Sequence, residues 1–267
     1  MTIDTPFEWQ LPVLRELWKE AFGDTDEFLD MFFTTAFAKE RCRCVTIEKD
    51  VVAALYWFDC DIKDKSNSPI AYIYAVATAQ KFRGQGLCHK LMEDTHNHLK
   101  KLGVQGAVLV PGSAKLFRFY EEIGYQTCSR IHSFRCVGKP EDVSFCQIDK
   151  REYANLRRHF LPKDGVIQEK ENLDFLEKQA KFYAGTDFLL AAYKDGSVLY
   201  GVELLGNASV AAGLVHALGC KEGYFRMPGQ EVITATEGLQ GKTMDFGMYH
   251  PLTEKEHIPK YFGLAFD

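Results

Sequence analysis

The sequence predicts an α/β protein of two domains, each with a central sheet flanked by helices. Three observations lead to this fold class. The chain has 267 residues, 46% of them hydrophobic, which is enough to build two cores. A buried strand, a glycine-bearing loop and a helix follow one another within residues 72–102. A polar, turn-rich segment at residues 138–142 separates this half from a second half with a partly similar order of elements.

Two helices open the first half. Apolar residues at helical spacing predict a first helix that ends at Gly23; they are Leu14, Leu17, Trp18, Ala21 and Phe22. Asp24 and Glu27 are spaced as in a capping box and predict the start of a second helix. The apolar residues that this helix turns inward are Phe28, Leu29, Phe32 and Phe33.

A hairpin and a central strand follow. Residues 42–48 and 51–58 are β-prone and predict a pair of antiparallel strands, while the polar residues 61–69 predict a loop. Residues 72–78 are apolar and predict a buried strand. From residue 87 the apolar period changes from two to between three and four, which predicts a long helix over residues 87–102.

The first half closes with a shorter unit of the same kind. Residues 106–110 predict a strand, residues 114–122 a helix, and residues 126–137 a closing pair of strands. The expected first domain therefore covers residues 1–137.

The loop between the central strand and the long helix is suited to an anion. Gly84 and Gly86 free the backbone where the chain must turn, and the helix that follows offers unpaired N–H groups and a positive dipole end. Arg83 adds a positive charge. A dinucleotide fingerprint needs a third glycine and an acidic residue about 20 positions later, and the segment has neither this pattern nor a Walker loop. The expected ligand group is a phosphate or pyrophosphate.

The same residues resemble a known family. The run from Val76 to Cys88 is similar to the acetyl-CoA-binding motif of the GCN5-related N-acetyltransferases (GNAT superfamily), Gln/Arg-x-x-Gly-x-Gly/Ala. Arg83 and Gly86 match, and Cys88 stands where the family has Gly or Ala. The later run from Tyr120 to Tyr125 resembles the family's Tyr-x-x-x-Gly-Phe/Tyr ending. The resemblance covers about residues 5–137 and implies mixed, mostly antiparallel sheets.

The resemblance also implies a function. It points to an N-acetyltransferase that passes the acetyl group of acetyl-CoA, its cosubstrate, to a primary amine by direct attack in a ternary complex. Tyr120 would be the general acid that protonates the leaving thiolate. The cosubstrate would be held by residues of the strand, the loop, the helix start and a later turn: Val76, Ala77, Thr78, Arg83, Gly84, Gln85, Gly86, Leu87, Cys88 and Ser113.

Several alternatives stay open. Tyr120 could be a core residue and Ser113 a plain helix N-cap. Where some relatives carry a glutamate base this chain has Tyr72, so Asp59, Asp61 or a chain of waters would have to accept the amine proton.

Two further alternatives concern the reaction itself. Cys88 could carry the acetyl group covalently, because a helix N-terminus lowers a thiol pKa. A non-catalytic CoA-binding or regulatory protein is the rival from another functional class.

The second half, residues 138–267, is expected to be a degenerate GNAT-like domain. A helical face around Leu176, strands at residues 188–193 and 198–205 joined by Asp195-Gly196, and a helix at residues 207–218 repeat the earlier order. The loop at residues 206–209 lacks the Arg-x-x-Gly pattern, so this half is not expected to bind CoA.

The rest of the second half adds three expectations. Residues 224–227 predict a further strand, and residues 250–267 are expected to pack across the second domain. The second domain is also a candidate dimerisation surface.

Composition excludes several classes. The formal net charge of −5 argues against partners such as nucleic acid or an anionic membrane. The absence of a signal-like N-terminus and of a long apolar run predicts a cytoplasmic protein. The eight cysteines are expected to be reduced, and no metal site is expected, even at His89, His96 and His98. Residues 241–243 and 245–247 only superficially match phosphate-loop and kinase motifs.

Overall fold

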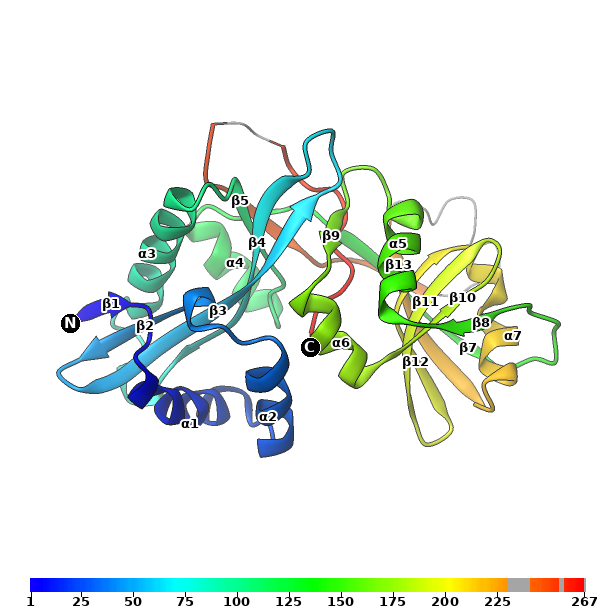
Figure 1. The fold of residues 1–267 in the computed structure, drawn as a ribbon, viewed down its shortest axis with the longest axis horizontal. Coiled ribbons are helices and arrows are strands. Elements are labelled where there is room, and N and C mark those ends of the chain that lie inside the picture. Colours follow the sequence, from blue (N-terminus) through cyan, green and yellow to red (C-terminus); the bar gives the residue numbers. More distant parts are fainter. Residues whose placement is uncertain (230–240, 255–256, 267) are drawn as a thin grey trace.

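The computed structural model describes residues 1–229, 241–254 and 257–266. Two mixed, largely antiparallel sheets lie side by side, with helices around and between them (Figure 1). The α/β fold class is therefore confirmed, and the two sheets are consistent with the expected two-domain arrangement. Within these described ranges, no helix is long and apolar enough to cross a membrane.

The first sheet has the strand order β1-β2-β3-β4-β5-β15-β6, with β9 paired to β3. Its strands are β1 (Thr2–Asp4), β2 (Cys42–Ile47), β3 (Asp50–Ile62), β4 (Ser68–Thr78), β5 (Gly106–Leu109), β6 (Gln126–Thr127), β9 (Val166–Gln168) and β15 (Met248–Pro251). The β4–β5 pair is parallel. Four α-helices and three short 3-10 helices surround it: η1 (Glu8–Gln10), α1 (Leu11–Phe22), α2 (Asp26–Thr35), η2 (Lys39–Arg41), η3 (Gln80–Phe82), α3 (Leu87–Lys101) and α4 (Ala114–Glu122).

The second sheet has the order β14-β7-β13-β12-β11-β10-β8. Its strands are β7 (Arg130–Val137), β8 (Cys146–Ile148), β10 (Lys181–Ala184), β11 (Phe188–Asp195), β12 (Val198–Gly206), β13 (Glu222–Pro228) and β14 (Gly241–Asp245). Its helices are α5 (Lys150–Phe160), α6 (Glu171–Gln179), η4 (Ala208–Val210) and α7 (Ala211–Ala217). The hairpin predicted at Asp195-Gly196 is confirmed, with Gly196 at φ +55°.

Three apolar clusters fill the spaces between these layers. One lies between the first sheet and α3 and α4, and another between the second sheet and α7. The third joins α1 and α2 to the opposite face of the first sheet and continues into α5, α6 and the second sheet. Because this middle cluster is shared, the two halves bury apolar surface against each other.

The start of α2 differs from the sequence prediction. Gly23 ends α1 as expected, at φ +75°. The N-cap of α2 is Thr25, whose hydroxyl accepts a hydrogen bond from the Phe28 N–H at 3.3 Å, so the capping box expected from Asp24 and Glu27 is wrong. Asp24 instead accepts a hydrogen bond from the Trp18 indole N–H at 2.7 Å, which leaves it unavailable as a cap.

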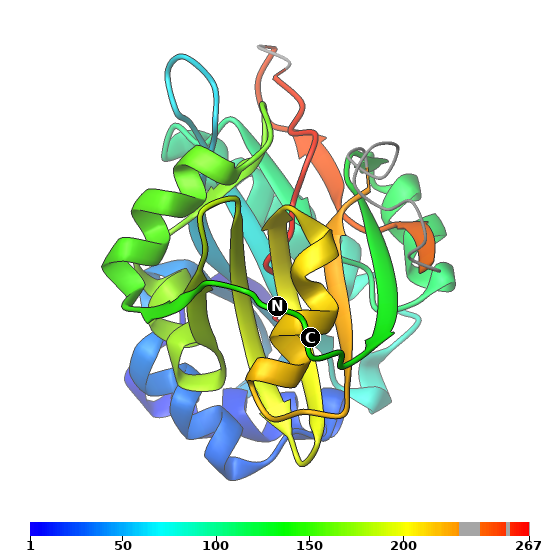
Figure 2. The ribbon, with the colours of Figure 1, turned by 90° about the vertical axis from the view of Figure 1, so that its right-hand side faces the viewer.

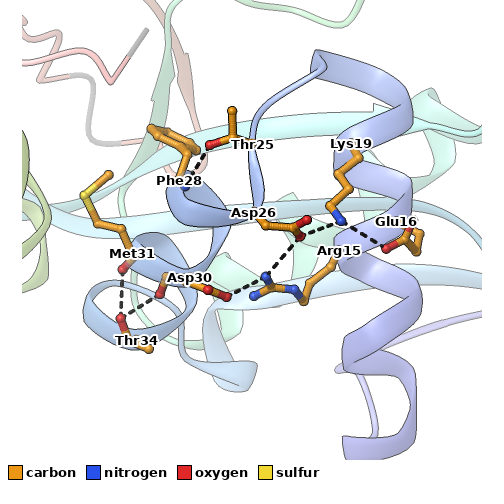
Figure 3. A network of polar contacts seen from close by, with 9 residues as sticks. All are labelled: Arg15, Glu16, Lys19, Thr25, Asp26, Phe28, Asp30, Met31 and Thr34. Atoms are coloured by element: carbon orange, nitrogen blue, oxygen red, sulfur yellow. Dashed lines mark hydrogen bonds and ion pairs between the residues drawn. The ribbon is translucent and has the colours of Figure 1, made fainter.

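Ion pairs tie the solvent sides of α1 and α2 together (Figure 3). Arg15 contacts Asp30 at 2.6 Å, and Lys19 contacts Asp26 at 2.5 Å. These carboxylates are largely exposed, so the pairs add little to stability and serve mainly to orient the two helices.

The two sheets exchange strands across the expected domain boundary. Residues 130–137 were expected to close the first sheet, but β7 pairs with β13 and β14 in the second. The last segment was expected to pack across the second domain; β15 instead enters the first sheet between β5 and β6. The physical cause is a turn after β6, where the Cys128 and Ser129 N–H groups both donate to the Gly247 carbonyl and direct the chain to the second sheet. The boundary at residue 137 stays a prediction.

Two glycines make room for β15. A Cβ at Gly106 would lie 2.1 Å from the Tyr249 hydroxyl oxygen, and a Cβ at Gly124 would lie 2.9 Å from His250 Nδ1. Gly124 also has φ +90°, which disfavours other residues. These contacts explain why small residues stand at both positions.

A buried ion pair connects the elements between the sheets. Arg157 of α5 makes a bidentate contact with Glu203 of β12, at 2.7 and 2.9 Å. The hydroxyls of Tyr153 and Tyr261 each donate to Glu203 at 3.0 Å, and Arg157 also donates to the Val166 carbonyl at 3.0 Å. The side chain of Arg157 is 3% exposed and that of Glu203 is fully buried, so the hydrogen bonds compensate for the lost hydration of both charges.

The C-terminal tail beyond Tyr261 runs between the sheets, where Figures 1 and 2 show it in red. The Gln168 side chain donates to the Leu264 carbonyl at 2.6 Å and accepts from the Leu264 N–H at 3.3 Å. Ser129 is bonded to both the N–H and the carbonyl of Phe262. The tail is therefore held in one position, with Phe266 packed against Phe58 of β3 at 4.8 Å between ring centroids.

Removing one partner of the buried ion pair should destabilise the fold strongly. Arg157→Met would leave Glu203 charged and buried, so we expect the free energy of unfolding to fall by about 3–5 kcal/mol. Urea denaturation followed by circular dichroism measures this change. Arg158→Met is the matched control, because Arg158 pairs with Glu169 on the surface and should cost less than about 1 kcal/mol. Equal losses in the two variants would contradict this role of the pair.

Candidate functional site

Strand β4 separates from β5 in its second half. The two strands pair over Ile70–Tyr72 of β4 and Gly106–Val108 of β5. Beyond Tyr72, the β5-side edge of β4 is paired with no strand in the described part of the chain, although β4 continues to Thr78. An open strand edge offers backbone N–H and C=O groups to an extended ligand, which can bind like an added strand.

The unpaired part of β4 also contains a bulge. Tyr56 faces Tyr74 and Ala54 faces Ala77, so Leu55 of β3 lies opposite both Ala75 and Val76. Ala75 has φ +47°, a conformation that non-glycine residues adopt at a cost of about 1–2 kcal/mol. Strain of this kind gathers at functional sites, and this bulge turns backbone groups of β4 out of the ladder.

The loop after β4 leads into the open end of a helix. Gly84 and Gly86 have φ +77° and +74°, and Gly86 is the N-cap of α3. Among the residues that the structure describes, no side chain caps α3, so its first N–H groups are available to an anion. Arg83 donates from Nε to the Thr78 carbonyl at 2.9 Å, which ties the loop to the end of β4 while its side chain remains exposed.

Tyr120 lies on the same side of the sheet as the start of α3. It packs in one apolar cluster with Val76, Leu87 and Cys88, and is 7% exposed. Burial, with a smaller contribution from the nearby Cys88 thiol, raises the pKa of Tyr120 above its usual value. The phenol is therefore protonated at neutral pH and can donate a proton.

The structure brings four of the predicted site residues into one cluster and separates others from it. Val76, Leu87, Cys88 and Tyr120 share one cluster, whereas Ala77 points into the cluster on the other face of β4. Ser113 is the exposed N-cap residue of α4, and its hydroxyl does not cap the helix.

The two aspartates weighed as bases lie too far from the bulge. Asp59 pairs with Ala71 and Asp61 with Pro69, at the other end of the β3–β4 hairpin. Four residues of strand separate Asp59 from Leu55, or roughly 13 Å. Asp59 also faces Arg41 at 3.7 Å, and the assignment of either aspartate as a direct base is not supported.

The histidines of α3 have structural partners. His96 is hydrogen-bonded through Nε2 to the Tyr125 hydroxyl at 2.8 Å and stacks on His250 of β15. Burial, and the neighbouring His250, lower the pKa of His96 to about 3, so this side chain is neutral at pH 7. No metal-binding group of His, Cys, Asp or Glu occurs among the residues that the structure describes.

In the second half, residues 206–209 correspond to the loop before α3, and this segment is held by hydrogen bonds of its own. Asn207 accepts hydrogen bonds from the N–H and the hydroxyl of Ser209, and α7 beyond it has only seven residues. The segment therefore lacks the uncapped long helix that α3 provides in the first half. Residues 241–243, which superficially match a phosphate-loop motif, lie in strand β14.

Comparison with known proteins agrees with these features. Residues 8–128 match the family model described as an acetyltransferase (GNAT) domain. The chain carries a GNAT domain. The comparison with curated proteins found no match to this sequence.

Solved structures show that the similarity in fold extends beyond the GNAT domain. A GCN5-related N-acetyltransferase from Kribbella flavida aligns with a TM-score of 0.72 and 15% identity, covering 93% of this chain and 70% of that one. One from Anabaena variabilis aligns at 0.75 and 12% identity, covering 94% and 73%. A putative acetyltransferase from Pyrococcus horikoshii aligns at 0.61 and 13% identity, covering 99% and 94%. At these identities the likeness concerns the fold, and it includes both sheets.

Two parts of the site could not be predicted from the sequence. Ala75 carries the bulge, and its sequence context held no signal because glycine is the usual residue at positive φ. The tail residue Phe266 packs on Tyr72 and Tyr74 of β4, at 5.9 and 6.1 Å between centroids. The sequence shows that residue 266 is aromatic, but the position of Phe266 on the first sheet depends on contacts between residues that are distant in sequence.

A charged side chain at Gly86 should abolish binding of acetyl-CoA. Gly86→Glu would place a carboxylate at the open end of α3, in a backbone conformation with φ +74°. We expect affinity to fall by at least about 100-fold in calorimetry, with circular dichroism unchanged. Gly196→Glu is the matched control, because Gly196 also has positive φ and open space around it but lies in the β11–β12 turn. Unchanged affinity in Gly86→Glu would refute the site.

The thiol of Cys88 should be unreactive. Burial raises its pKa to about 11, so the nucleophilic thiolate is scarce at pH 8. We expect iodoacetamide to alkylate the exposed Cys146 well before Cys88, as followed by mass spectrometry of peptides. Cys88→Ala should retain activity, which argues against the covalent-carrier alternative. Accumulation of an acetylated Cys88 during turnover would instead support the role of this residue as a covalent acetyl carrier.

Proposed function

We propose that the protein transfers the acetyl group of acetyl-CoA to a primary amine by direct attack in a ternary complex. The observation that carries this proposal is the open, bulged half of β4 beside the uncapped start of α3. One end of this arrangement suits a pyrophosphate, and the other suits an extended pantetheine arm that ends at the bulge. The GNAT match over the same residues supports it.

The residues of the site can be assigned to the steps of the reaction. The backbone around Val76 would polarise the thioester carbonyl, and the loop from Arg83 to Cys88 would hold the phosphates. The amine nitrogen forms a bond to the carbonyl carbon, and the carbon–sulfur bond breaks. The thiolate takes the proton of Tyr120, and the extra proton of the amine leaves to water. The Tyr120 phenolate then regains a proton from water, which returns the site to its starting state.

Calorimetric titration tests the proposal first. Acetyl-CoA is titrated into the pure protein, with free CoA as a second ligand and NADH as a negative control. We expect one acetyl-CoA per chain, followed by release of free thiol when a primary amine is added. Binding of acetyl-CoA without turnover of any amine would favour the rival function, a non-catalytic CoA-binding or regulatory protein.

Loss of the Tyr120 hydroxyl should affect turnover and not binding. Tyr120→Phe keeps the ring in its apolar cluster but removes the proton donor, so we expect kcat to fall about 100-fold and the Kd of acetyl-CoA to stay within twofold. Because burial raises the tyrosine pKa, wild-type kcat should not decline through deprotonation of this group between pH 7 and 10. A parallel loss of kcat and affinity would make Tyr120 a structural residue.

A further inference from the structure

A turn after α4 links the proposed general acid to a second, buried tyrosine. Tyr120 lies near the end of α4, and the Tyr125 N–H donates to the Tyr120 carbonyl at 3.0 Å. The two rings meet edge to face, with 5.7 Å between their centroids. Because protein interiors are close-packed, the orientation of the Tyr120 ring depends on the position of the Tyr125 ring. This inference rests on the proposed function, since it concerns the group that would protonate the leaving thiolate.

Tyr125 is held in place through its hydroxyl. The side chain is 1% exposed, and the hydroxyl is hydrogen-bonded to Nε2 of His96 in α3 at 2.8 Å. Burial raises the pKa of Tyr125, while burial and the neighbouring His250 lower the pKa of His96 to about 3, so both groups are neutral at pH 7. A neutral phenol and a neutral imidazole together supply the one donor and the one acceptor that this bond needs. A buried hydroxyl is costly to leave unpaired, so the bond fixes the Tyr125 ring.

His250 of β15 completes this group of side chains. Its ring stacks on His96 with 4.5 Å between centroids and lies 5.3 Å from the Tyr125 ring. Its Nδ1 donates to the Gly124 carbonyl at 2.9 Å, since a carbonyl oxygen only accepts. We call His96, Tyr125 and His250 the His–Tyr cluster. The His250 imidazole thus contacts α3, the turn after α4 and the second tyrosine at once.

The same turn is joined to the first sheet through β15. Directly after Tyr125, β6 is two residues long, and in the described part of the chain it pairs only with β15. Strand β15 in turn pairs with β5 over its whole length, from Met248 to Pro251. The strand that carries His250 therefore also attaches the turn to the sheet, although His250 follows Gly124 by 126 residues.

The His–Tyr cluster lies away from the phosphate end of the site. His96 is nine residues beyond Leu87, the first residue of α3, or roughly 13 Å along the helix axis. An anion at the start of α3 is therefore out of reach of His250, which stacks on His96. The route from this cluster to the reaction is the packing of Tyr125 on Tyr120.

We propose that His250 is a positioning residue for proton transfer from Tyr120, so that a strand from the second half of the chain sets the efficiency of this step. The ring of His250 provides most of the effect, because Gly124 is exposed and water can replace the imidazole at its carbonyl. Without the ring, Tyr125 and Tyr120 gain freedom to move. A displacement of about 1 Å at a reacting group can lower a rate about 100-fold.

Kinetics of His250 variants test the proposal in the full-length protein. The assay follows thiol release at saturating acetyl-CoA, with the primary amine that the wild type turns over fastest. We expect His250→Ala to lower kcat about 10-fold, with the Kd of acetyl-CoA within twofold of wild type. His250→Phe keeps a ring against His96 and Tyr125 and should retain kcat within about threefold of wild type.

A histidine elsewhere provides the control for these variants. His216→Ala removes an exposed imidazole near the end of α7, in the second half, and should leave kcat and Kd unchanged. An equal loss of kcat in His250→Phe and His250→Ala would overturn the role of the ring.

A double-mutant cycle separates positioning from a general loss of structure. If His250 acts through Tyr120, His250→Ala should lower kcat no further once Tyr120→Phe has removed the proton donor. If His250 only supports the fold, the two losses multiply, and this result would refute the proposal while leaving the general acid standing. An unchanged kcat in Tyr120→Phe would instead overturn the acid assigned in the proposed function, and the role of His250 with it.

Amide hydrogen exchange tests the same contacts without any turnover. In His250→Ala, we expect peptides covering residues 121–127 to exchange at least about 10-fold faster than in the wild type or in His250→Phe, because the turn loses the packing that keeps its hydrogen bonds closed. Unchanged exchange in His250→Ala would overturn the proposal. Faster exchange in a protein that acetylates no amine would overturn the transferase function and leave the link between β15 and the turn standing.

Discussion

The bidentate contact between Arg157 and Glu203 is the interaction on which the relation between the two halves depends. It joins α5 to β12, and its hydrogen bonds reach β9 through the Val166 carbonyl and the tail through the Tyr261 hydroxyl. Glu203 has no exposed surface, so its charge requires all of these partners. The tail therefore starts from this buried charge pair at Tyr261, and the hydrogen bonds of Ser129 and Gln168 hold the residues that follow it.

The reactive region depends on a different constraint, the bulge of β4. A regular strand would continue its ladder with β3 and present alternate side chains to both faces. The extra residue at Ala75 and the early end of pairing with β5 together expose backbone groups midway along a buried sheet. The strain at Ala75 is maintained because β4 pairs with β3 on both sides of the bulge, over residues 68–74 before it and over Ala77 and Thr78 after it. The groups that this region offers to a ligand are therefore mainly backbone N–H and C=O groups, and few side chains are needed.

Local signals in the sequence predicted local structure well. The loop at Gly84 and Gly86, the helix that follows and the hairpin at Asp195-Gly196 are all encoded by neighbouring residues, and all are confirmed. The cap of α2 was misplaced by one residue, since Asp24 and Thr25 are both good caps and only the contact with Trp18 decides between them. The destination of β7 and β15 could not be predicted, because strand partners more than 80 residues apart leave no periodic signal. The position of Phe266 against Tyr72 and Tyr74 could not be predicted for the same reason, since Phe266 reaches β4 only through the tail.

The return of β15 has a consequence for the order in which the protein can be built. During synthesis, β5 and β6 leave the ribosome long before residues 248–251, the strand that fills the gap between them. Until that strand arrives, the GNAT domain exposes two unpaired edges, and edges of this kind recruit other chains. The first sheet therefore stays incomplete until nearly the whole second half has been translated.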